Sequence, residues 1–535
     1  MAVTRNILVI KLIFKNMQKY FLIFLFLLGS APALAKTYNL EIKKQDVFIT
    51  GKAVEAITIN GGIPGPTLRW QEGEEVVVNV KNSMDETTSI HWHGILLDGS
   101  MDGVPGLNGF EGIAPHTSFT YKFKIRQKGT YWYHSHSNLQ EAQGVYGSIV
   151  IEPSETKVDR DYVILLSDFS EENPNTILNN LKIDSGYYNY NKRTVSTFFS
   201  DIKKNGFSNT VSDYMDWGSM RMDPTDLSDV SKYQFLINGK TANQNWSAIF
   251  KKGERIKLRF INASAMTIYD VAIPGLKMKL VEADGQSVKP ISIDEFRFGV
   301  AETYDVIVEP KENKAYTIFA ESIDRTGYAR GTLSPKKEMT GKIPSLRPRA
   351  VLTMADMAMG GMDHNSMKEM SDEEMSSMNM NDVKSGWADR GTKEGNKALE
   401  YSDLISLHTQ KDLRQPTREI EFKFGGSMNR YIWTINGEKF PKPMHLKYGE
   451  RVRLKFVNET MMAHPIHLHG MFMQMENGQS VEWMPNKHTV IVPPAQSVSL
   501  LLTADEAGEW AFHCHLLLHM ASGMMTSVTV DKENK

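Results

Sequence analysis

One short unit occurs three times along this 535-residue chain, and it constrains the fold more than any other feature. Each copy has an Ile-Asn-Gly turn, then a Gly-Glu turn and a strand whose apolar side chains recur at every second position. The copies occupy residues 59–82, 237–262 and 435–458. Each is followed by a second set of corresponding stretches, at residues 129–136, 315–322 and 508–515. A repeat of this kind indicates one supersecondary unit used three times.

The repeats predict an all-β protein, because short strands between Gly, Pro and Asn turns are typical of β-sandwiches. We expect three sandwich domains near residues 36–153, 158–335 and 400–532, with little helix apart from a short turn after His515. Residues 336–399 lose the β pattern, and we interpret them as a linker or surface insertion. This insertion is rich in methionine, with His364 among nine of them: Met354, Met357, Met359, Met362, Met367, Met370, Met375, Met378 and Met380.

The N-terminus has the pattern of a secretion signal. Basic residues between positions 11 and 19 precede an apolar run at 21–28, which is too short to span a bilayer comfortably. Ala-Leu-Ala at 33–35 is a small-residue cleavage pattern, so residues 1–35 should be removed on export. An uncleaved anchor and initiation at Met17 are the alternatives. No later run predicts a membrane span, and a net charge of −2 gives no basic field for nucleic acid.

Ten of the 15 histidines form four clusters, two in the first domain and two in the third. The clusters contain four His-X-His pairs: His91 and His93, His134 and His136, His467 and His469, and His513 and His515. Side chains two residues apart point to one face of a strand, so eight imidazoles can converge where these domains meet. Imidazoles with few carboxylates favour copper over hard cations. Unrelated structural or surface histidines are the alternative, and the repetition of the pair argues against it.

A second kind of metal site is indicated by Cys514, which is the sole cysteine of the chain. It lies between two histidines of one pair and must therefore point away from them. His519 and Met524 follow it, and two His, one Cys and a weak axial Met make a blue-copper site. The remaining ligand is best supplied by His464, which lies three residues before a His-X-His pair and across a proline. Cys514 would then join two metal sites covalently.

These clusters resemble those of the multicopper oxidases, a family with three cupredoxin domains. The resemblance implies a type 1 copper at His464, Cys514 and His519 with axial Met524, a type 2 copper at His91 and His467, and a type 3 pair held by His93, His134 and His515 and by His136, His469 and His513. It implies four copper ions, one-electron oxidation of substrate at type 1, and relay through the catalytic Cys514. Dioxygen would be reduced to two waters at the three-copper site.

Asp102 is a second candidate catalytic residue. It lies nine residues after His93, where the resembling oxidases carry an acid near the three-copper site. A carboxylate there is suited to supply protons for oxygen reduction. The alternative is an ordinary turn aspartate in the Met-Asp-Gly sequence at 101–103.

Within the family, residues 464–471, 487–496 and 513–525 and the Met-rich segment most resemble the CopA-type, copper-resistance branch of the bacterial periplasm. The resemblance implies oxidation of Cu(I), a substrate that thioethers bind well. Two alternatives remain open: a copper-sequestering protein, and a laccase-like oxidase of phenols. The branch's usual twin-arginine signal is missing, and Met520 stands where related cuprous oxidases carry an acid.

Residues outside the clusters receive simpler interpretations. Six methionines near the type 1 ligands would either line a docking site for Cu(I) or fill the core; they are Met461, Met462, Met471, Met473, Met475 and Met484. We interpret His116, His408, His445 and His488 as structural or surface residues. The middle domain has no ligand pattern and is assigned an architectural role only.

Overall fold

The structure, a computed structural model, describes residues 36–153, 157–189, 194–219, 227–231, 233–348, 387, 390–427 and 430–531. The expected signal segment 1–35 and the methionines of 354–380 lie outside these residues. In the part of the chain that is described, no helix is long and apolar enough to cross a membrane.

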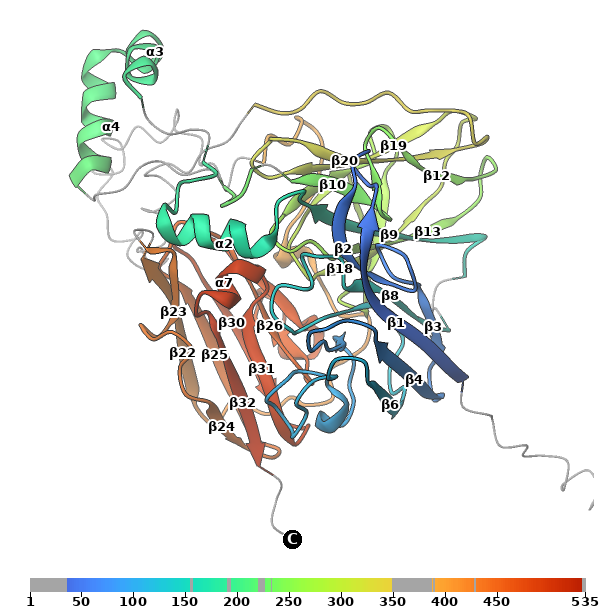
Figure 1. Cartoon of the computed structure of the whole chain (residues 1–535). Coiled ribbons are helices and arrows are strands. Elements are labelled where there is room, and N and C mark those ends of the chain that lie inside the picture. Colours follow the sequence, from blue (N-terminus) through green and yellow to red (C-terminus); the bar gives the residue numbers. More distant parts are fainter. Residues whose placement is uncertain are drawn as a thin grey trace, which may run out of the picture.

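The described residues form six β-sheets, two for each repeat, which confirms the all-β prediction (Figure 1). In the first domain the sheets have the strand orders β2-β1-β4-β6 and β3-β8-β7-β5. Their strands are β1 (Lys36–Val47), β2 (Val54–Ile59), β3 (Leu68–Gln71), β4 (Glu75–Asn82), β5 (His91–His93), β6 (Ser118–Lys124), β7 (Gly129–His134) and β8 (Tyr146–Glu152), with a 3-10 turn at Gly99–Met101.

The middle domain has sheets of order β11-β10-β9-β13-β18-β15-β16 and β12-β20-β19-β14-β17-β21. Their strands are β9 (Arg160–Phe169), β10 (Gln234–Ile237), β11 (Lys240–Thr241), β12 (Trp246–Ile249), β13 (Ile256–Asn262), β14 (Tyr269–Ala272), β15 (Met278–Ala283), β16 (Gln286–Ile293), β17 (Glu295–Phe298), β18 (Thr303–Val308), β19 (Tyr316–Ser322), β20 (Tyr328–Ser334) and β21 (Ala398–Leu399). Strand β21 comes from the segment expected to be a linker and pairs with β17.

The third domain has the orders β23-β22-β25-β30-β27-β28 and β24-β32-β31-β26-β29. Its elements are β22 (Glu419–Ser427), β23 (Ile432–Ile435), β24 (Met444–Lys447), β25 (Arg451–Asn458), β26 (His464–Leu468), β27 (Met473–Met475), β28 (Asn486–Lys487), β29 (Thr489–Val492), β30 (Ser497–Thr503), β31 (Gly508–Cys514), α7 (Leu517–Ala521) and β32 (Met525–Asp531), with 3-10 turns at Tyr401–Asp403 and Val481–Trp483.

The three domains share one topology, which explains the sequence repeat. Each has the same parallel pair in one sheet, namely β1 with β4, β9 with β13 and β22 with β25. Each also has a parallel pair in the other sheet, namely β3 with β8, β12 with β20 and β24 with β32. The repeated Gly-Glu turn therefore leads into the same central strand in every domain.

Helix is a minor component, as expected, and α7 is the short helix predicted after His515. Three helices of the middle domain were not expected: α2 (Pro174–Ile183), α3 (Val195–Asn205) and α4 (Phe207–Ser219). Helices α3 and α4 form a hairpin that stands away from the sheets, whereas α2 lies beside α7 (Figure 1).

Candidate metal centre

The structure brings the four His-X-His pairs together between the first and third domains. Strand β5 pairs with β7 and β26 pairs with β31, so the pairs of each domain lie on or next to adjacent strands. Rings of the two domains stack: His91 on His469 and His93 on His467, each with centroids 3.8 Å apart. All eight rings are buried except that of His136, which is partly exposed.

The imidazoles fall into three groups. Ring nitrogens lie within 4.8 Å of one another in each of these sets: His91, His467 and His469; His93, His134 and His515; His136, His469 and His513. In the third set the Nε2 atoms of His469 and His513 are only 3.2 Å apart. The pocket can therefore offer three imidazoles to each of two neighbouring ions, with His91 and His467 beside them.

Hydrogen bonds on the far side of the rings fix their orientation. Five Nδ1 atoms have an oxygen partner: His91 with Asp102 O at 2.9 Å, His134 with Glu141 Oε2 at 2.7 Å, His467 with His488 O at 2.7 Å, His469 with Asp102 Oδ2 at 2.9 Å and His513 with Cys514 O at 2.9 Å. An Nδ1–H that donates to oxygen leaves the Nε2 lone pair free for a ligand, as in metal-binding histidines generally.

The free nitrogens fit copper. Among the described side chains, the Nε2 atoms of His91, His134, His136, His467 and His515 and both nitrogens of His93 are buried without a hydrogen-bond partner. Burial, and then the neighbouring imidazoles, hold the pKa of most of these rings well below the ordinary value, so the rings are neutral. Neutral buried nitrogens without partners are costly unless they bind something, and converging imidazoles suit copper.

Cys514 faces away from this pocket and meets two of the other predicted ligands, His464 and His519. Its Sγ lies 3.6 Å from His464 Nδ1 and 3.8 Å from His519 Nδ1, and those nitrogens are 3.1 Å apart. Met524 is fully buried, and its backbone bonds to both Cys514 and His519. The Nε2 of His464 contacts Thr460 Oγ1 at 2.7 Å, which leaves Nδ1 toward the sulfur. Burial raises the pKa of the thiol, and a coordinating metal would deprotonate it.

The middle domain supplies a residue to this second site, which corrects the purely architectural role assigned from the sequence. Asp229 Oδ2 accepts from His519 Nε2 at 2.7 Å and from the Tyr431 hydroxyl at 2.8 Å. Trp433 stacks on the His519 ring at 3.8 Å, and His519 is fully buried. No sequence motif marks Asp229, because it is a loop aspartate 290 residues from its partner.

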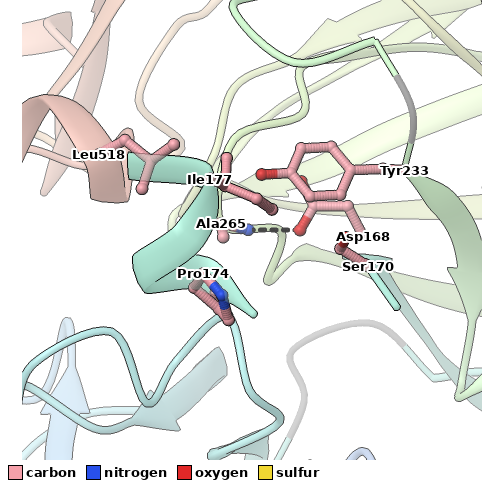
Figure 2. Close-up of a pocket in the computed structure, with 8 residues that line it drawn as sticks. Asp168, Ser170, Pro174, Ile177, Tyr233, Ala265 and Leu518 are labelled. Carbon is pink, nitrogen blue, oxygen red and sulfur yellow. Dashed lines mark hydrogen bonds between the residues drawn. The ribbon is translucent and has the colours of Figure 1, made fainter. Parts of the chain in front are cut away.

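A second aspartate of the middle domain fixes the helix that carries His519. Asp168 accepts from the backbone N–H groups of Ala265 and Met266 at 2.8 and 2.9 Å. The same loop binds α7, since Leu517 N–H donates to Ala265 O and Leu518 N–H donates to Met266 Sδ. Figure 2 shows Asp168 bonded to Ala265, with α7 nearby. Asp168 therefore aligns α7 through the loop.

Two further residues of the imidazole pocket were missed. Glu141 is buried, with Oε2 at 2.7 Å from His134 Nδ1 and Oε1 at 4.0 Å from His515 Nδ1. The sequence contained one signal for Glu141, namely that this acid follows closely after a His-X-His pair. Of the two interpretations given for His488, the surface one was wrong, because the residue is buried and its ring lies 4.7 Å from that of His93, edge to face.

The remaining sequence interpretations concern three histidines and six methionines. His116, His408 and His445 are exposed, as the surface interpretation expects. The six methionines near the type 1 ligands are all buried: Met461, Met462, Met471, Met473, Met475 and Met484. They lie in the core, as the core-filling alternative expects.

The chain belongs to the multicopper oxidases, whose family models match residues 41–156, 160–338 and 413–534, and it is a copper-dependent oxidase. Its relatives include the Copper resistance protein A homolog of Pseudomonas syringae pv. tomato, 47% identical over 94% of each chain. Copper resistance protein A of Escherichia coli is 46% identical over 92% of each chain. The fold is similar to that of Fet3p, a multicopper oxidase that functions in iron import, with a TM-score of 0.69, 18% identity, and coverage of 93% of this chain and 90% of that one.

Proposed function

We propose that this protein is a periplasmic copper-resistance oxidase that oxidises Cu(I) to Cu(II) with dioxygen. Four Cu(I) ions would give four electrons, which with four protons convert one dioxygen to two waters. The observation that carries the oxidase proposal is the position of Cys514. It belongs to the proposed type 1 site and lies in the chain between His513 and His515, whose rings belong to the imidazole pocket. The similarity to the copper resistance proteins, which covers nearly the whole chain, supports the substrate and the location.

Four copper ions would occupy the two sites. The proposed type 1 ligands are His464, Cys514, His519 and Met524; the type 2 ligands would be His91 and His467; the type 3 ligands would be His93, His134 and His515 on one ion and His136, His469 and His513 on the other. The unpartnered nitrogens support this assignment. Bound copper would supply one-electron acceptance at one site and oxygen reduction at the other.

The chain's own residues position these ligands and connect the sites. Cys514 links them through its backbone to His513 and His515, which is the shortest covalent route available. Asp102 holds His91 through its carbonyl and His469 through its carboxylate. Its Oδ1 is buried, lies 3.3 Å from His91 Nδ1 and makes no hydrogen bond, so we assign to this atom the proton supply expected from the sequence.

The burial of His519 limits how an organic substrate could reach this site. The ring is fully buried between Trp433 and Asp229, so a bulky aromatic donor has no direct contact with it. We further propose that the Met-rich segment 354–380, which lies outside the described residues, collects Cu(I), because thioethers prefer that ion.

Copper-loaded protein assayed in parallel with Cu(I) and a phenol tests the proposal. We expect faster turnover of Cu(I), with oxygen consumed in proportion, and loss of Cu(I) oxidation but not of phenol oxidation after deletion of residues 354–380. Preferred oxidation of the phenol would identify a laccase-like enzyme. Lost copper tolerance with unchanged Cu(I) kinetics would identify copper storage as the main role.

A further inference from the structure

Glu141 is a buried acid that lies against two histidines of the copper pocket. Its Oε2 atom accepts from His134 Nδ1 at 2.7 Å, whereas its Oε1 atom lies 4.0 Å from His515 Nδ1 and has no hydrogen-bond partner. The side chain is 2% exposed. Within the part of the chain that is described, it forms no ion pair with a lysine or an arginine. A carboxylate taken out of water without an opposite charge is costly.

Another buried acid of the chain shows the usual way of accommodating such a group. Glu282, in the middle domain, lies 2.6 Å from the buried ammonium group of Lys257. Glu141 instead has a second carboxylate in its surroundings, that of Asp168, which adds repulsion. By the same electrostatics, a cation bound near Glu141 would stabilise the carboxylate and be stabilised by it.

The loop between β7 and β8 holds Glu141 in this place. The side chain of the neighbouring Gln140 accepts from the Thr88 hydroxyl at 2.7 Å, and the backbone carbonyl of Glu141 accepts from Gly144 N–H at 3.0 Å. Gly144 has a φ of +118°, and a Cβ on it would lie 2.6 Å from the carbonyl oxygen of Ile57. The first domain thus fixes the backbone around Glu141, and the direction of its carboxylate follows from this loop.

The carboxylate of Glu141 lies beside histidines from two domains. His134 ends β7 of the first domain and His515 follows β31 of the third, and their ring nitrogens form one group with those of His93. Trp132 stacks on the His134 ring with centroids 4.3 Å apart, so an indole holds this ring at its face and the carboxylate holds it at its edge. One acid therefore lies next to two of the three imidazoles that are proposed for the same ion.

We propose that Glu141 is a positioning residue of the copper centre, which holds His134 and balances the charge of the ion assigned to His93, His134 and His515. It acts through the imidazoles and adds no ligand to that ion. A carboxylate bonded to Nδ1 fixes the tautomer and orientation of the ring and raises the basicity of Nε2, which has no hydrogen-bond partner in His134. The inference rests on the proposed assignment of those three histidines to one ion.

The test compares Glu141→Gln and Glu141→Leu with the wild type, each as the full chain with and without copper. Glutamine keeps an oxygen that can accept from His134 and removes the charge, whereas leucine removes both. We expect type 3 copper to be bound about 10-fold more weakly in Glu141→Gln and about 100-fold more weakly in Glu141→Leu, the range for groups that support metal ligands. Chelator titration with metal analysis measures this affinity, and loss of one ion of the pair gives the other an electron paramagnetic resonance signal. The blue absorption of the type 1 site should not change.

The melting temperature of the copper-free protein separates this role from a purely structural one. Removal of a buried acid that has no cationic partner should not lower this temperature in Glu141→Gln, although the variant holds copper more weakly. Glu282→Gln is the matched control, because it takes a buried acid away from Lys257; it should lower the melting temperature and leave copper retention unchanged.

Two results would overturn the proposal, and Glu141→Gln alone decides if the leucine variant does not fold. One is wild-type copper retention in Glu141→Gln. The other is a melting temperature of copper-free Glu141→Gln below that of the copper-free wild type. Failure of the wider copper assignment would instead appear in the wild type, as missing blue colour or fewer than four coppers.

Discussion

Replacing Asp229 by asparagine removes one negative charge from the type 1 site and keeps its shape. The carboxylate accepts hydrogen bonds from His519 Nε2 and from Tyr431, and an asparagine carbonyl can accept the same bonds. The variant therefore tests charge rather than orientation. We expect Asp229→Asn to raise the reduction potential of the type 1 copper, because the oxidised ion loses a stabilising negative neighbour.

The size of the shift follows from the contact with His519. The path from Asp229 to an ion at His519 Nδ1 consists of the 2.7 Å hydrogen bond, one imidazole ring and a metal–nitrogen bond. With a metal–nitrogen bond of about 2 Å, the carboxylate and the ion are about 6 to 7 Å apart. Two unit charges at that separation interact by about 2.5 kcal/mol at an effective dielectric constant of about 20. For one electron this is about 100 mV.

A redox titration followed by the blue absorption band measures this shift. Tyr431→Phe keeps the charge and loses one hydrogen bond, so its potential should move much less than that of Asp229→Asn. Asp201→Asn, on the outlying helix α3, is the matched control for loss of a carboxylate. An unchanged or lowered potential in Asp229→Asn, with the blue band intact, would refute the electrostatic reasoning.

Three further predictions concern other parts of the metal centre. Cys514→Ser should abolish the blue colour and substrate oxidation but leave copper in the imidazole pocket, as measured by absorption and metal analysis. Asp102→Asn should keep the blue colour and slow oxygen turnover by roughly 100-fold, the scale of a lost proton donor, measured by oxygen consumption. Asp168→Ala leaves two backbone N–H groups and the Thr267 hydroxyl without their acceptor, so it should lower the free energy of unfolding by about 3 kcal/mol in denaturant titration.

For each of these three variants, one experimental result would contradict the prediction. Wild-type turnover in Cys514→Ser would remove the electron route through this residue. Unchanged oxygen consumption in Asp102→Asn would leave that side chain as an orienting group only. A free energy of unfolding equal to that of the wild type in Asp168→Ala would mean that the loop at residues 263–267 does not depend on this acceptor.

The grouping of the proposed copper ligands was predictable because their signals are local. Strand alternation places the two residues of a His-X-His pair on one face and Cys514 on the other, whatever the rest of the fold does. His464 was recognisable for a similar reason, since it lies three residues before His467 on the same strand, β26. The repeat fixed the β-sandwich class, and the family resemblance added the division of imidazoles among ions.

The groups that hold these ligands were not predictable in the same way. Asp229 reaches His519 from another domain, and His488 meets His93 from a distant strand end. No residue spacing in the sequence indicates either contact. The helices of the middle domain were missed because the β repeat was carried across residues 170–219, where it does not apply.

The sequence by itself determined the all-β repeat, the four histidine pairs and the reversed direction of Cys514, because the period of a strand encodes which side chains share a face. Only the tertiary structure decided that Asp229 of the middle domain contacts His519 and that the ring of His488 lies beside that of His93. Those relations depend on how three sandwiches pack against one another, and packing brings together residues hundreds of positions apart. The stretch from His513 to Met524 thus holds five of the proposed ligands, while Asp229, Asp168 and Asp102 from the other two domains contact the residues around them.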